Sequence, residues 1–235
     1  MKPYQSITIH ECGEPLVPIP LETFAAVQPH PYVCLGAPYG DRSPYWLRES
    51  VLAALHQAQA YLQHQHPGWT IQIFDAYRPV AVQQFMVDYS FSTLAQQRQQ
   101  QPEALTAAVR QALLAEVYQF WAAPSLDPAT PPPHSTGAAV DITLINAQGQ
   151  AVDMGSPIDE ISIRSHPDYF APEGEHRDDT VHHHRCLLKK TLAGAGFRQH
   201  PNEWWHFSLG DQLWAWQTQN QTQQRCIARY GRVEA

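Results

Sequence analysis

The sequence predicts an α+β fold, a single domain over residues 1–235 in which a small antiparallel sheet is flanked by helices. Short strand-like segments are mixed with separated helical segments, and no internal repeat is visible. A chain of 235 residues is long enough for a buried core. Its composition, 43% hydrophobic and 16% charged, is typical of a globular protein and excludes disorder.

The first 45 residues are predicted to form an irregular arm with short strands at most, because prolines and turn residues crowd them. A helix follows, since apolar residues recur at helical spacing from Leu47 to about Tyr61. Pro67-Gly68 ends that helical region.

The next part of the chain contains a strand and two helices. Residues 69–75 alternate apolar and polar side chains and so predict a strand, followed by a turn at 75–79 and a helix at 80–89. A second helix is expected at about 104–121, where apolar residues share one face. The glutamine-rich residues 96–101 between them are either a structured bridge or a mobile insertion.

Short strands and loops dominate the second half of the chain. We expect, in order, a proline-rich loop at 124–133, a strand at 138–144, a hairpin-like turn at 146–149, a loop at roughly 153–180, a helix at 182–195, and strands at 197–198 and 203–208. Glycines at positions 194 and 196 end that last helix.

Charge and cysteine content narrow the function classes. The net charge is -7 with only 15 Lys and Arg and no basic run, which argues against a nucleic-acid partner. No apolar stretch approaches the roughly 20 residues of a membrane span, and the N-terminus lacks the apolar core of a signal peptide. Four scattered cysteines favour reduced thiols in the cytoplasm, although two disulfides stay open. These cysteines are Cys12, Cys34, Cys186 and Cys226.

Two short segments carry the residues of a catalytic zinc site. Residues 203–207 read EWWHF, and residues 134–141 read HSTGAAVD. They supply two histidines, one aspartate and a spare glutamate. In such a site three N/O ligands hold the metal, one position stays open for water, and the free carboxylate takes a proton from that water.

The spacing of these residues sets a condition on the backbone. His134 and Asp141 are seven residues apart and would face opposite sides of one straight strand, so Gly137 must allow the chain to turn between them. The same rule applies to Glu203 and His206. We therefore expect Glu203 at a bend or loop end, just before the strand that carries His206.

Simpler interpretations compete with this one. A single histidine is more often a surface or core residue than a ligand, and His-x6-Asp or Glu-x2-His alone is a weak signal. Asp141 could merely open a strand. Residues 182–184 are three histidines, but adjacent residues on a helix point in different directions, so we assign them to a helix surface.

Arg78 has two equally supported interpretations. It lies between a strand and a helix, where it could form a structural salt bridge or stabilise a developing oxyanion. Other catalytic classes find less support, because the chain has no G-x-S-x-G, P-loop or H-E-x-x-H motif. Composition leaves a cysteine–histidine nucleophile open, but no cysteine has a suggestive context.

These motifs together resemble the D-alanyl-D-alanine dipeptidases of the vancomycin-resistance type, a branch of the zinc D,D-peptidases. The resemblance follows the family's order over roughly residues 70–208. It rests on His134-x-x-Gly137-x-Ala139-x-Asp141, Glu203-x-Trp205-His206, Asp75–Pro79, Asp153–Asp159, and Arg185-x-x-Leu188 running into Gly196-Phe197.

The resemblance implies a role for each matching residue. It implies a small α+β metallopeptidase that binds one zinc ion and hydrolyses D-Ala-D-Ala. Glu203 would act as general base and then acid, and Arg78 would stabilise the oxyanion. Asp159 would receive the substrate ammonium, and Tyr32 matches a substrate-contacting tyrosine. The implied zinc ligands are His134, Asp141 and His206.

One departure and two competing functions accompany this expectation. The family commonly has a serine two residues before the first histidine ligand, where this chain has Pro132. A D,D-carboxypeptidase acting on longer peptidoglycan peptides is the first alternative, and the absence of a signal peptide argues against it. A non-catalytic zinc-binding domain is the second, and it would need neither Glu203 nor Arg78.

Overall fold

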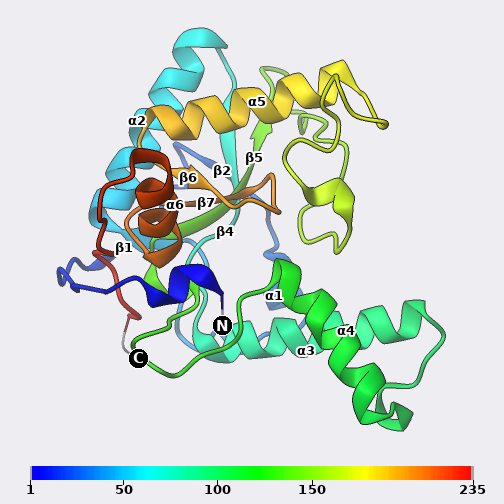
Figure 1. The fold of residues 1–235 in the computed structure, drawn as a ribbon. Helices are drawn as coiled ribbons and strands as arrows, with labels where there is room; N and C mark the ends of the chain where they lie inside the picture. Colours follow the sequence, from blue (N-terminus) through cyan, green and yellow to red (C-terminus); the bar gives the residue numbers. More distant parts are fainter. Residues whose placement is uncertain (1, 234–235) are drawn as a thin grey trace.

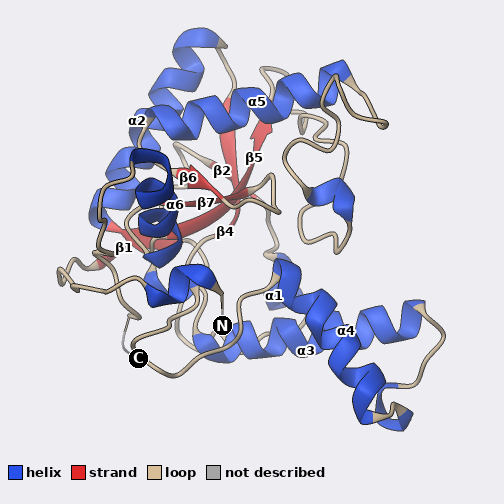
Figure 2. Cartoon of the chain, viewed as in Figure 1, coloured by secondary structure: helices blue, strands red, loops and turns tan. Residues whose placement is uncertain are grey.

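The computed structural model describes residues 2–233 and confirms the α+β fold (Figures 1 and 2). The α-helices are α1 (Pro31–Cys34), α2 (Glu49–Gln65), α3 (Val80–Gln97), α4 (Ala107–Phe120), α5 (Asp179–Gly194) and α6 (Gln212–Thr222). The strands are β1 (Leu16–Pro18), β2 (Ala25–Ala26), β3 (Trp46–Arg48), β4 (Thr70–Asp75), β5 (Ala139–Ile145), β6 (Arg198–Gln199) and β7 (His206–Ser208). Short 3-10 turns are η1 (Pro3–Ser6), η2 (Pro102–Ala104), η3 (Pro133–Thr136) and η4 (Ile163–Ser165).

The main sheet has the strand order β2-β4-β5-β7-β6. Three of its pairs are antiparallel as predicted, but β2 runs parallel to β4. The strands that carry the site are therefore antiparallel as predicted, and only the edge strand β2 is parallel to its neighbour. The physical reason is the connection: α2 lies between β2 and β4 in the sequence, and a crossover through a helix returns the chain in the same direction.

Helices α2 and α5 cover one face of the sheet (Figure 1). The predicted spacing of apolar residues in α2 is confirmed, since one face of this helix is fully buried against the sheet. The shared core includes Val51, Leu55 and Leu62 from α2, Leu188 and Leu192 from α5, and Ile71, Ile73, Ile142 and Leu144 from the strands. This packing holds β4 and β5 rigidly in place.

Several element boundaries differ from the prediction for local reasons. Leu47 pairs with Val17 in the small β1–β3 sheet, so α2 begins only at Glu49. Helix α3 continues to Gln97 and takes in part of the glutamine-rich segment. Helix α5 begins three residues early because the Asp178 side chain caps it, accepting hydrogen bonds from two backbone N–H groups of its first turn.

Helix α6 was not predicted, and it fixes the N-terminal segment. Its N-cap is Asp211, which accepts a hydrogen bond from the backbone of Trp214 at 2.8 Å. The Gln212 amide donates to the carbonyl oxygen of Ile7 at 2.7 Å. Within residues 2–233 no helix is long and apolar enough to cross a membrane.

Candidate metal and catalytic site

Pairing across three strands aligns three of the site's polar residues. Asp141 on β5 lies directly opposite His206 on β7, and Asp75 at the end of β4 lies opposite Asp141 on its other side. Side chains of directly opposed residues project from the same face of a sheet. The strand register therefore brings Asp75, Asp141 and His206 together in a row.

His134 reaches this row from outside the sheet. It lies on η3, and Gly137 then turns the chain into β5 with a φ of 70°. This left-handed conformation suits glycine, and a Cβ at this position would clash with the Leu16 side chain. The expected turn at Gly137 is therefore present.

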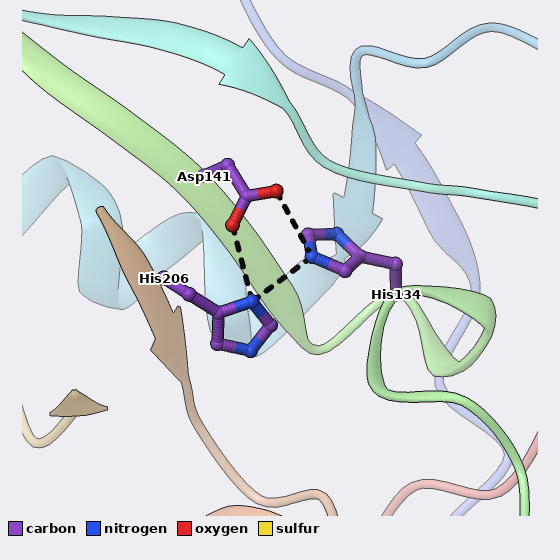
Figure 3. Close-up of side chains that lie close together, drawn as sticks. All are labelled: His134, Asp141 and His206. Carbon is purple, nitrogen blue, oxygen red and sulfur yellow. Dashed lines mark hydrogen bonds and ion pairs between the residues drawn. The ribbon is translucent and has the colours of Figure 1, made fainter. Parts of the chain in front are cut away.

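The structure brings together the three predicted ligands (Figure 3). The two oxygens of Asp141 lie 3.2 Å from His134 Nε2 and 3.1 Å from His206 Nδ1. The two imidazole nitrogens are 3.1 Å apart. Donor atoms on a tetrahedral zinc with bonds of about 2.0–2.1 Å are separated by roughly 3.3 Å, so this group of three fits such an ion.

The other nitrogen of each imidazole has its own partner. His134 Nδ1 lies 2.7 Å from the carbonyl oxygen of Ala76 and can donate to it, while His206 Nε2 lies 3.3 Å from the Ser208 hydroxyl. These contacts orient the remaining nitrogens toward Asp141. Asp141 is buried, and both of its carboxylate oxygens face these imidazole nitrogens, as a metal ligand requires.

The charge of this cluster is set by its neighbours. Burial opposes the ionisation of Asp141, but His134 and His206 outweigh it and hold the pKa of Asp141 well below its usual value. The aspartate is therefore ionised over the physiological range and available as an anionic ligand.

Glu203 lies where the spacing required, in the connection just before β7. It is 5% exposed, and its Oε2 lies 3.7 Å from His206 Nδ1. Burial, followed by the negative charge of Asp141, raises the pKa of Glu203 well above its usual value. A buried carboxylate beside the ligand cluster can accept and return a proton.

Arg78 forms a structural salt bridge, which was the first interpretation of this residue. It also lines the cavity, as the second interpretation, stabilisation of an oxyanion, requires. Its Nε donates to Asp75 at 2.9 Å, and its Nη2 lies 3.2 Å from Asp141. The guanidinium lies between the Tyr32 and Trp121 rings, about 5 Å from each centroid. Arg78 is thus held rigidly next to the ligand cluster.

Asp159 and Tyr32 meet, although 127 residues separate them. The Tyr32 hydroxyl donates to Asp159 Oδ2 at 2.7 Å. Burial, followed by the charge of Asp141, raises the pKa of Asp159 to about 7. The backbone of Asp159 has a φ of 67°, a strained conformation for a non-glycine residue.

One cavity joins these groups. Arg78, Asp159, Glu203 and the ligand cluster all line it. The sequence analysis missed other lining residues, which come from distant segments and gave no local signal: Lys2, Tyr4, Gln83, Trp121 and His200. Residues 182–184 lie on α5, two of them half-buried and one exposed, and do not join the group of potential metal ligands.

Comparison with known proteins identifies the family. The family model described as D-ala-D-ala dipeptidase, Peptidase M15, matches residues 25–225. A D-alanyl-D-alanine dipeptidase of Synechocystis sp. is 50% identical over 100% of this chain and 98% of its own length. The chain belongs to the Peptidase M15 D-Ala-D-Ala dipeptidase family. It is therefore a peptidase.

More distant relatives were also found for this dipeptidase family member. A D-alanyl-D-alanine dipeptidase of Escherichia coli K12 is 39% identical over 32% of this chain and 37% of the relative. Among solved structures, VanYB in complex with D-alanine-D-alanine superimposes with a TM-score of 0.45 at 18% identity, covering 77% of this chain and 80% of that chain. The LdcB LD-carboxypeptidase gives a TM-score of 0.47 at 13% identity, covering 92% and 76%.

Proposed function

We propose that this peptidase hydrolyses D-Ala-D-Ala to two molecules of D-alanine and that it uses one zinc ion. The observation that carries the proposal is the arrangement within one cavity. A three-ligand cluster and Glu203 line it together with Asp159, whose half-buried carboxylate suits a free ammonium. The family membership supports the same substrate class.

The zinc ligands in this proposal are His134, Asp141 and His206. Two imidazoles and one carboxylate are a typical donor set for catalytic zinc, and three protein ligands leave a position open. When bound, zinc supplies Lewis acidity and lowers the pKa of a coordinated water to about 7. All other steps are assigned to the side chains of this protein.

Glu203 transfers the protons of the reaction. It takes a proton from the attacking water and later delivers it to the amine of the leaving D-alanine. The raised pKa of Glu203 suits this double role, because a carboxyl group that holds its proton more firmly can carry it between the two steps.

Arg78 and Asp159 position the substrate and stabilise its charges. The Arg78 guanidinium faces the developing negative charge on the carbonyl oxygen, and its fixed contacts avoid a reorganisation cost during the reaction. Asp159, oriented by Tyr32, accepts the ammonium of the first D-alanine. A longer or N-acylated peptide carries no charge there, so this pairing selects dipeptides.

We further propose that residues 1–235 act as one metallopeptidase domain in the cytoplasm, with no nucleic-acid partner. All four cysteines are free thiols in the structure, which supports a reducing compartment. The low content of Lys and Arg and the net charge of -7 support the absence of a nucleic-acid partner.

The test is D-alanine release from D-Ala-D-Ala by zinc-loaded protein, with Glu203→Gln and the exposed Glu175→Gln as a matched control. We expect Glu203→Gln to lose about 100- to 10,000-fold in kcat while keeping its zinc, because a general base is removed. Removal of zinc by a chelator should abolish release, and added zinc should restore it. No release from folded, zinc-bound wild type would contradict the proposal.

A further inference from the structure

The proposed dipeptide substrate has two charged ends, and only one has a partner so far. This inference rests on the proposed function, which pairs the substrate ammonium with Asp159. The C-terminal carboxylate of the dipeptide is left without a cation. Removing a carboxylate from bulk water is costly unless an opposite charge receives it.

Among the described residues that line the cavity, Arg78 and Lys2 are the two permanent cations. The proposed function assigns Arg78 to the carbonyl oxygen of the scissile bond, and its contacts with Asp75, Gln83 and Asp141, at 2.9 to 3.2 Å, fix it in that position. Lys2 makes no ion pair within 4.0 Å to another described residue. Its ammonium is therefore available to a ligand.

The N-terminal segment is fixed so that Lys2 stays at the cavity. The backbone N–H of Lys2 donates to Gln5 Oε1 at 2.8 Å at the start of η1. Tyr4 is 5% exposed and lines the same cavity. Further along, the Gln212 amide on α6 binds the carbonyl oxygen of Ile7. These contacts fix the turn that follows Lys2.

The reaction proposed above places the substrate carboxylate near Glu203. Lys2 and Glu203 both line this cavity. Burial lowers the pKa of Lys2, and the negative charge of Glu203 opposes that shift. In the proposed reaction Glu203 protonates the leaving amine. The carboxylate of that same D-alanine is separated from its amine by a single carbon atom, so it must lie on the Glu203 side as well.

We propose that the Lys2 ammonium binds the C-terminal carboxylate of the dipeptide substrate. Pro132, two residues before His134, offers no side-chain donor for this carboxylate. With Lys2 and Asp159 both lining the cavity, the two ends of a zwitterionic dipeptide find opposite charges there. Lys2 is thus a specificity-determining residue that selects substrates with a free carboxyl terminus.

The test compares D-Ala-D-Ala with D-Ala-D-alaninamide, whose terminal amide carries no charge. In the full zinc-loaded chain we expect Lys2→Gln to raise KM for D-Ala-D-Ala about 10-fold or more, the size expected for losing a charge-assisted contact. The KM for the amide should stay unchanged. Lys2→Arg should keep much of the preference, and Lys190→Gln, on the exposed face of α5, should behave as wild type.

Two results would overturn the inference, and they differ from failure of the proposed function. If Lys2→Gln changes KM equally for D-Ala-D-Ala and D-Ala-D-alaninamide, or changes neither KM, then Lys2 does not bind the carboxylate. Zinc content and thermal unfolding of the variant show whether its fold is intact, and Lys2→Arg gives a second measurement. If the wild type hydrolyses neither substrate, the proposed dipeptidase activity itself fails.

Discussion

Two groups of residues at the site are built by different means. The residues of the ligand cluster lie on η3, β5 and β7, and strand register aligns them. The other group, which is assigned to substrate binding, is Lys2, Tyr32 and Asp159, and these residues come from the N-terminal segment, a one-turn helix and a loop. Chemistry is thus carried by the rigid sheet, whereas substrate selection is carried by segments that can change with little effect on it.

Arg78 belongs to both groups and gives the largest expected effect. A lysine at this position keeps the charge but lacks the planar fork that contacts Asp75 and Gln83 together. We expect Arg78→Lys to lower kcat about 100- to 1,000-fold, as for loss of an oxyanion donor. Steady-state kinetics with D-Ala-D-Ala would measure this, with the exposed Arg225→Lys as control. A near-normal kcat would limit Arg78 to a structural role.

A variant of Asp159 tests whether the residues assigned to substrate binding affect KM alone. We expect Asp159→Asn to raise KM for D-Ala-D-Ala about 10- to 100-fold with a smaller change in kcat, because the lost partner is an ion pair with the substrate ammonium. N-acetyl-D-Ala-D-Ala should be a poor substrate for wild type and variant alike. The exposed Asp41→Asn serves as control. An equal fall in kcat would mean that the two groups are not separable.

The smallest expected effect is that of Tyr32→Phe on the pH dependence of kcat/KM. Burial and then Asp141 raise the pKa of Asp159 to about 7, and only ionised Asp159 pairs with the ammonium. Therefore kcat/KM should fall as the pH drops through about 7. The Tyr32 hydroxyl stabilises the ionised form, so Tyr32→Phe should shift this acidic limb to higher pH.

The size of this last effect is modest. At pH 7 we expect Tyr32→Phe to lose up to about 10-fold in kcat/KM, the value of one hydrogen bond. A pH profile from 5.5 to about 9 measures the shift. An aspartate with the unperturbed pKa of about 3.9 would titrate below this range and would produce no limb within it. Tyr89→Phe on the exposed surface should leave the limb in place. If the acidic limb of Tyr32→Phe stays in place, the Tyr32 hydroxyl does not influence the ionisation of Asp159.

The first group was largely predictable from the sequence, because its signals are local. Gly137 and the odd spacing of His134 and Asp141 required a turn, and the structure has one. The position of Glu203 before β7 followed from the same alternation rule. What the pattern could not give was the strand register, which places Asp75 beside Asp141 and so explains how Arg78 is held.

The other group was predicted only where the family resemblance reached it. Asp159 and Tyr32 were named on that ground, and their hydrogen bond depends on tertiary packing that no spacing reveals. Lys2 gave no signal, because a single lysine near a chain end is ordinarily a solvated residue. Helix α6 was missed because its apolar residues are few and widely mixed with glutamines, although Asp211 was a readable N-cap.

The position of the two chain ends has a practical consequence for anyone preparing the protein. Lys2 lines the cavity, and near the other end the backbone of Val233 donates to the carbonyl oxygen of Ser135, the residue after His134. An affinity tag fused directly before Lys2 would therefore adjoin a residue that lines the cavity. Kinetic constants should be compared before and after its proteolytic removal.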